Sequence, residues 1–257
     1  MSKIHSLDIY QNAIDSLNEG IEICERALED DSKYKFSVII ISNFMELLLK
    51  HMVELQNPLL IYEKPYSDKI NKEKTITWTQ AINILTNSGK IVNNKLIEDI
   101  KKLTDLRNNI IHFKFEYKAV EIDSIILSVI DGLCELFKNI TGKDIIIDVQ
   151  ENTKKILEKI KGDYLNELHQ AQFTAKEESE NDSLEILDCN YCYEEKTAVE
   201  RHDGEIFCHF CGESDSLHEC ARCTCEYLTS DMEYFGETED GFTLYLCDHC
   251  SGLLNED

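Results

Sequence analysis

FSVIIISNFMELLLKHMV, residues 36–53, is the most apolar stretch of this 257-residue chain. Glu46 and Lys50 interrupt the stretch, which disfavours a membrane span and predicts a helix buried in a protein core. Apolar residues also recur at helical spacing on both sides of it. We expect helices near 6–29, 34–56, 77–87, 93–113 and 118–140. The first 140 residues are therefore predicted to form a mainly α-helical bundle.

The chain after the bundle divides into segments of different composition. KDIIIDV (143–149) is expected as a short strand, and residues 150–172 return to helical spacing. AKEESENDS (175–183) is acidic, polar and without core-forming residues, which predicts a flexible linker. We therefore expect a helical domain over 1–172, an acidic linker over 173–187 and a separate module over 188–257.

Nine of the eleven cysteines follow residue 188, and eight of these form C-x-x-C pairs. No apolar secretion signal is visible near the N-terminus, so the pairs indicate thiolates on metal in a reducing, cytoplasmic compartment rather than disulfides. Two such pairs complete one tetrahedral site, which predicts two structural Zn²⁺ ions. The predicted ligands are Cys189, Cys192, Cys208, Cys211, Cys220, Cys223, Cys247 and Cys250.

The pairing of the four C-x-x-C motifs is open between two arrangements. Sequential pairing gives tandem zinc ribbons, whereas alternating pairing gives a cross-brace. HDGEIFC (202–208) and EDGFTLYLC (239–247) each contain an Asp-Gly hairpin signal before a C-x-x-C motif, which favours ribbons. Further side chains that could replace a ligand are Cys225, His202, His209, His218 and His249.

Charge is distributed unevenly along the chain, whose net formal charge is −24. Residues 1–170 hold 22 basic and 27 acidic side chains, whereas residues 171–257 hold 4 basic and 23 acidic ones. The cysteine module should therefore repel nucleic acid. It is expected to stabilise the fold, to dock a basic protein partner such as an antitoxin, or to cover a substrate site. KPYSDKINKEK (64–74), by contrast, is expected to be a polar loop rich in lysine.

LRNNIIHF (106–113) places a cation within an apolar helix face. At about 100° per residue, Arg107 falls at the centre of a stripe that includes Leu103 and Ile111. A guanidinium in that position must be paired or must open onto a cleft. Asn108 and His112 are i,i+4 neighbours on the adjacent face. These side chains are therefore a candidate polar site.

LRNNIIH (106–112) matches the R-x4-H motif of the HEPN family, and FMELLLKHM (44–52) resembles the second helix of that family. The resemblance covers roughly residues 5–140. It implies a helical bundle and a metal-independent endoribonuclease of the toxin–antitoxin, abortive-infection or antiphage type. Two protomers of such a ribonuclease place both motifs in one composite cleft, so the resemblance also implies a homodimer.

Carried over to this chain, the resemblance assigns roles to individual residues. His112 would act as general acid and base at the ribose 2′-hydroxyl, leaving a 2′,3′-cyclic phosphate. Arg107 would bind the scissile phosphate, and Asn108 would orient the histidine or the phosphate. We expect Glu46, on the neighbouring helix, to hold Arg107. The expected partners are RNA and a second copy of the chain, with no membrane; the alternative is a non-catalytic adaptor protein.

Overall fold

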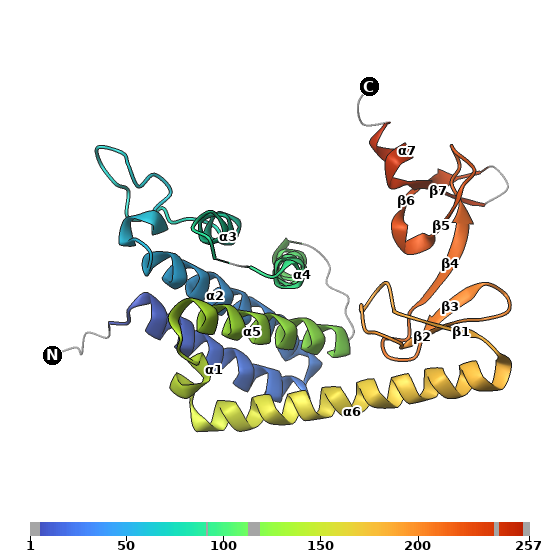
Figure 1. Ribbon diagram of the computed structural model, residues 1–257, viewed down its shortest axis with the longest axis horizontal. Helices are drawn as coiled ribbons and strands as arrows, with labels where there is room; N and C mark the ends of the chain where they lie inside the picture. Colours follow the sequence, from blue (N-terminus) through green and yellow to red (C-terminus); the bar gives the residue numbers. More distant parts are fainter. Residues whose placement is uncertain (1–5, 91, 113–118, 239–241, 254–257) are drawn as a thin grey trace. The chain divides into compact units, whose positions relative to one another are not determined.

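The computed structural model describes residues 6–90, 92–112, 119–238 and 242–253 (Figure 1). The chain separates into two compact units, Met1–Tyr164 and Leu165–Asp257. The first unit is helical and the second is rich in short strands. Each unit is therefore described by itself.

The helical unit is built from amphipathic helices linked by short 3-10 turns. Its helices are α1 (Ile9–Ala27), α2 (Tyr34–Glu54), α3 (Trp78–Asn87), α4 (Asn94–His112), α5 (Ala119–Thr141) and the first half of α6 (Glu151–Asp182). The 3-10 turns are η1 (Asp31–Lys33), η2 (Pro58–Ile61) and η3 (Ile145–Asp148). These bounds lie close to the helices expected from apolar spacing, so the prediction of a mainly α-helical bundle is confirmed.

Helix α2 is the core of this unit because it packs against α1, α3, α4 and α5. Phe44, Leu48 and Leu49 of α2 are fully buried, and each such side chain contributes about 2 kcal/mol through burial. Residues Asp31–Glu54 are apolar and long enough to cross a membrane by length and composition. Their apolar side chains nevertheless fill the core of the bundle, as the sequence predicted.

The side chains at the helix ends explain where helices begin. Asp8 and Gln11 form a capping box at the start of α1, and Thr77 and Gln80 form another at α3.

In Figure 1, α3 and α4 are seen nearly end-on, whereas α1, α2 and α5 are seen from the side. Helices α3 and α4 thus cross α1, α2 and α5, and a polar pocket forms beside α2.

The second unit contains an antiparallel sheet, a hairpin and a short helix. Strands β1 (Glu185–Leu187), β2 (Ala198–Glu200), β3 (Glu205–Cys208), β4 (Ser214–Glu219) and β5 (Glu226–Leu228) follow one another in sheet order. The 3-10 turn η4 (Thr229–Asp231) leads to the hairpin of β6 (Met232–Glu237) and β7 (Thr243–Cys247), and α7 (Asp248–Gly252) follows. The small strand-rich module expected after the bundle is confirmed.

The strand expected over 143–149 is wrong, because residues Ile145–Asp148 form the 3-10 turn η3. The Asp144 side chain accepts a hydrogen bond from the Ile146 backbone at 2.9 Å and starts the turn. Ile145 is fully buried whereas Ile147 is 74% exposed. A strand would have placed both residues on one face. The apolar run therefore serves to bury Ile145 alone and does not form a strand.

The flexible segment expected over 175–183, within the acidic linker expected over 173–187, is also corrected, because α6 continues to Asp182 and β1 follows at Glu185. Ala171 and Ala175 are buried one turn apart on the helix. Ser183 then takes a left-handed conformation, with φ of 56°, and ends the helix. Glu177, Glu180 and Asp182 are exposed, whereas Glu178 is half-buried.

Candidate functional site

Helix α4 presents Arg107 to a pocket in the helical unit. Leu96, Ile100 and Leu103 of α4 are buried in the core, and Arg107 lies one turn beyond them with a half-buried side chain. The pocket has a volume of about 440 Å³. Its lining comes from four helices: Asp15, Ser16, Glu19, Ile39, Ile40, Ser42, Asn43, Met45, Glu46, Trp78, Thr104 and Arg107.

Polar contacts shape the wall of this pocket. Asn43 Nδ2 donates to Ser16 Oγ at 2.9 Å, and Thr104 Oγ1 donates to the backbone carbonyl of Ile100 at 2.8 Å. Within the described parts of the chain, Arg107 makes no hydrogen bond and no ion pair. Its guanidinium therefore remains available to an anion that enters the pocket.

Glu46 and Arg107 line the same pocket, but the ion pair expected between them is not formed. Glu46 Oε1 instead lies 2.5 Å from Lys50 Nζ, four residues along the same helix. Lys50 Nζ also donates to Thr75 Oγ1 at 2.9 Å. A glutamate four residues before a lysine is a favourable pair on a helix, and this local partner competes successfully with Arg107.

Asn108 and His112 do not line the pocket. Asn108 is half-buried and His112 is exposed at the end of α4. Five residues of helix rotate His112 by about 140° from Arg107, so one chain does not point both side chains at one spot. Ile111, expected within the apolar stripe, is 45% exposed, whereas Asp99 was overlooked and is buried beside Ser128.

The second unit brings its cysteines together in two groups of four. One group holds Cys189, Cys192, Cys208 and Cys211, and the other holds Cys220, Cys223, Cys247 and Cys250. Within each group, the sulfur atoms all lie within 4.8 Å of one another. The sequential pairing is therefore confirmed, and the cross-brace is excluded.

The sulfur–sulfur distances fit a tetrahedral metal site. Cys189 and Cys211 sulfurs lie 3.7 Å apart, and those of Cys192 and Cys208 lie 3.8 Å apart. Four sulfurs at about 2.3 Å from a central ion stand about 3.8 Å from one another. A disulfide would need about 2.05 Å. Both groups thus have the donor type and the spacing of a structural metal site.

Three of the four C-x-x-C motifs share one backbone turn. The residue after the second cysteine has a left-handed φ, of 62° at Tyr193, 70° at Gly212 and 58° at Thr224. In each turn, the amide of that residue donates at 2.9 Å to the carbonyl of the first cysteine. The turn aims further backbone amides at the sulfurs, which stabilises thiolates by charge-assisted hydrogen bonds.

Backbone donors also affect the acidity of the second group. Amides of Cys223 and Cys247 lower the pKa of Cys220 to about 6. The Cys247 amide lies 3.5 Å from the Cys220 sulfur. Cys225 and the four histidines considered as substitute ligands are outside both groups. His209, for example, uses its ring to contact a helix instead.

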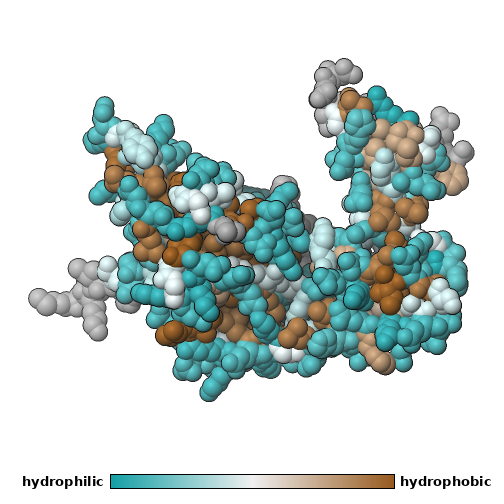
Figure 2. Space-filling view, viewed as in Figure 1, coloured by the Kyte–Doolittle hydropathy of each residue, from teal (hydrophilic) through white to brown (hydrophobic). Residues whose placement is uncertain are grey.

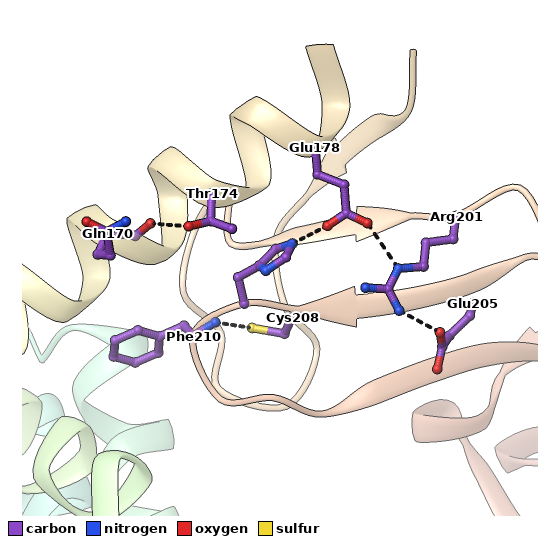
Figure 3. Close-up of polar contacts among 8 residues, drawn as sticks. Gln170, Thr174, Glu178, Arg201, Glu205, Cys208 and Phe210 are labelled. Atoms are coloured by element: carbon purple, nitrogen blue, oxygen red, sulfur yellow. Dashed lines mark hydrogen bonds and ion pairs between the residues drawn. The ribbon is translucent and has the colours of Figure 1, made fainter. Parts of the chain in front are cut away.

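Glu178 joins the second half of α6 to the first ribbon, which is the part of the chain that carries Cys189, Cys192, Cys208 and Cys211 (Figure 3). Its carboxylate accepts from Arg201 Nε at 3.1 Å and lies 2.6 Å from His209 Nε2. Arg201 Nη1 also donates to Glu205 at 2.9 Å. Burial raises the pKa of Glu178, but the hydrogen bonds from Arg201 and His209 outweigh this effect and hold it below its usual range.

Sequence reasoning did not find Glu178 or Trp78. Glu178 lies in the acidic segment expected to be flexible, and its contacts become visible only when the ribbon packs on α6. Trp78 is the only tryptophan of the chain and follows the capping threonine of α3, but nothing local places it at a pocket.

Fold and site together define a helical domain joined to a module with two four-cysteine groups of metal-binding geometry. Residues 8–191 match the family described as a domain of unknown function, DUF3644. Because the match covers most of the chain, the protein belongs to this family. No curated protein and no solved structure matches the chain.

Proposed function

We propose that the protein is a metal-independent endoribonuclease of a toxin–antitoxin or antiphage system. The observation that carries this proposal is Arg107, a half-buried guanidinium on a pocket of about 440 Å³ with no ion pair among the described residues. A guanidinium that forms no ion pair at a pocket can bind an anionic group such as the RNA phosphate. The R-x4-H spacing to His112, with its resemblance to the HEPN family, supplies the matching proton-transfer group.

In the proposed reaction, His112 removes the proton of the ribose 2′-hydroxyl, and the resulting oxygen attacks the adjacent phosphorus. The bond from phosphorus to the 5′-oxygen breaks, that oxygen takes up the proton that the histidine removed, and a 2′,3′-cyclic phosphate remains. Arg107 offsets the charge that grows on the phosphate, and Asn108 orients the reacting groups. The wide angle between Arg107 and His112 on α4 supports a homodimer, in which two copies of the helix contribute to one cleft.

We further propose that each four-cysteine group holds one Zn²⁺. Four thiolates at tetrahedral spacing satisfy zinc fully and leave no position for a reacting water, so both ions would be structural. Cysteines that bind metal rather than form disulfides would suit a reducing, cytoplasmic setting. Elemental analysis of the purified protein should give about two zinc ions per chain. A value near zero after preparation under reducing conditions would refute the assignment.

A non-catalytic adaptor is the second candidate, and the composition of the pocket favours it. Asp15, Glu19 and Glu46 line the pocket together with Arg107, and their carboxylates would repel RNA. The adaptor function would use the acidic second unit to dock a basic partner, such as an antitoxin. Tyr234, Phe235 and Phe242 there are between 56% and 71% exposed and offer apolar anchors, and Figure 2 shows apolar surface on this part.

One assay separates the two functions. Purified protein is incubated with total RNA in EDTA, beside the variants Arg107→Ala and His112→Ala, and the metal content is measured in parallel. If the protein is a ribonuclease, the wild type should cleave RNA and leave cyclic-phosphate ends on the products. Both variants should cleave at least about a hundredfold more slowly. Equal cleavage by all three proteins, or none by wild type, would refute the ribonuclease proposal.

A further inference from the structure

Residues 62–76 form a closed loop between η2 and α3. Its two ends pair through a bridge between Tyr62 and Thr75, and the amide of Glu63 donates to the carbonyl of Lys74 at 3.1 Å. Inside the loop, Ser67 Oγ donates to the carbonyl oxygens of Lys64 and Lys69, each at 3.0 Å. The loop is therefore a shaped projection rather than an open linker.

The loop carries positive charge in a strongly acidic protein. Lys64, Lys69, Lys72 and Lys74 are exposed, against Asp68 and Glu73 within 64–74, whereas the whole chain carries −24. Lys74 lies 3.9 Å from Glu63, but the other three lysines have no ion pair among the residues that the structure describes. Three free ammonium groups on one loop can each neutralise a phosphate.

Tyr66 stands among these lysines with 84% of its surface exposed, the most of the large hydrophobic side chains in the described parts. A single exposed aromatic residue is ordinary on a protein surface. An exposed ring between cations, however, is the arrangement on which unpaired bases stack. The combination favours a single-stranded nucleic acid over an acidic peptide, which would use the lysines but not the ring.

Contacts connect the end of the loop to the arginine pocket. Thr75 Oγ1 accepts from Lys50 Nζ at 2.9 Å, and Lys50 holds Glu46 at 2.5 Å on the pocket wall. Trp78, two residues after the loop, lines the same pocket as Arg107. A strand of RNA bound along the loop would thus be led towards the pocket.

We propose that the loop 62–76 binds the single-stranded segment of the RNA substrate. Lys64, Lys69 and Lys72 contact successive phosphates, and Tyr66 stacks on one base. This assignment rests on the proposed ribonuclease function, and it names the substrate form: unpaired RNA, because a paired base offers no free face for stacking.

The test measures binding of a fluorescein-labelled 12-nucleotide adenosine RNA to the full chain carrying His112→Ala, which prevents turnover. The triple variant K64Q/K69Q/K72Q is compared with K143Q/K155Q/K159Q, which removes the same charge from exposed lysines elsewhere in the helical unit. Each lost phosphate contact lowers the slope of log affinity against log salt by about 0.7. The loop triple should therefore lower it by about 2, and the control triple should leave it nearly unchanged.

Tyr66→Ala should weaken binding by roughly tenfold through lost stacking, without a change in the salt slope. Equal slopes in the two triples, unchanged affinity in Tyr66→Ala, or no RNA binding by the parent would each overturn the inference. Loop-dependent binding of a decaglutamate peptide as tight as that of RNA would overturn it in favour of an acidic protein partner.

The two proposals fail in distinguishable ways. If the chain with His112 intact leaves RNA uncut while the loop triple still loses binding, the ribonuclease proposal fails and the loop inference stands. If that chain cleaves RNA and the loop triple binds and cleaves like the control triple, the loop inference fails alone. Circular dichroism and thermal unfolding of each variant establish that the fold is retained.

Discussion

Replacing Glu178 with glutamine should loosen the second half of α6 from the first ribbon. Gln and Glu have similar helix propensities, so the change isolates the carboxylate. The side chains of Glu178, Arg201 and His209 are 23%, 35% and 14% exposed, respectively. Their contacts thus fall between exposed ion pairs, at about 0.2–1 kcal/mol, and buried charged hydrogen bonds, at about 1.5–3 kcal/mol.

Two contacts at about 1 kcal/mol each contribute about 2 kcal/mol. Glutamine keeps one neutral acceptor, which retains about 0.6 kcal/mol, so the free energy of local opening should fall by about 1.4 kcal/mol. Local opening should therefore be about tenfold more frequent. The assay is amide hydrogen exchange of peptides that cover residues 170–182 at pH 7. At that pH the contribution of Glu178 is fully present, because a carboxyl with a lowered folded-state pKa stabilises above its unfolded pKa and loses this effect as the pH falls.

Glu180→Gln is the matched control on the same helix. Glu180 is 68% exposed and lies 3.7 Å from Lys176 in a surface pair, which contributes at most about 0.5 kcal/mol. Exchange should hardly change in this variant. Equal acceleration in both variants, or less than a twofold change in Glu178→Gln, would refute the reasoning.

Three further predictions concern the cysteine module and its charge. Cys208→Ser should lower the metal content by about one ion per chain by elemental analysis, and retention of two ions would contradict the four-cysteine grouping. Thr224→Gly should slow metal loss to a chelator severalfold. The left-handed conformation at φ 58° strains a β-branched residue by about 1 kcal/mol, and glycine avoids this strain. Faster metal loss from the variant would contradict this prediction. Removing residues 165–257, with 24 acidic and 4 basic side chains, should raise affinity for single-stranded RNA at low salt, and weaker binding by a folded fragment would argue against electrostatic opposition.

The helices and the ligand pairing were predictable because their signals are local. Apolar spacing marks α2 and α4 within the segments themselves, and a helix needs no distant partner for its hydrogen bonds. The Asp203-Gly204 turn appears where expected, with Gly204 at φ 82° between β2 and β3. The second Asp-Gly signal, within 239–241, lies outside the described residues, but the pairing of β6 with β7 agrees with the predicted hairpin.

The remaining features depend on tertiary contacts that no local pattern encodes. Residues 173–182 have the composition of a linker, but Ala175 is buried and Glu178 contacts Arg201 and His209 of the first ribbon. Glu46 had two cations within reach, Lys50 and Arg107, and the choice between them depends on side-chain positions. The pocket combines residues from α1, α2, α3 and α4, so its lining could not be assembled before the helices were packed.

Strand β4 has a consequence for how the two cysteine groups fill with metal. It pairs with β3 through Ser214, Asp215 and Ser216, and with β5 through Leu217, His218 and Glu219. One strand of six residues thus lies between Cys211 of one group and Cys220 of the other. Binding of the first ion orders this strand and lowers the conformational entropy of the chain. The second ion then binds to a strand that is already ordered, so its own entropy cost is smaller. We therefore expect metal uptake by the two groups to be cooperative, with few singly loaded chains at half saturation.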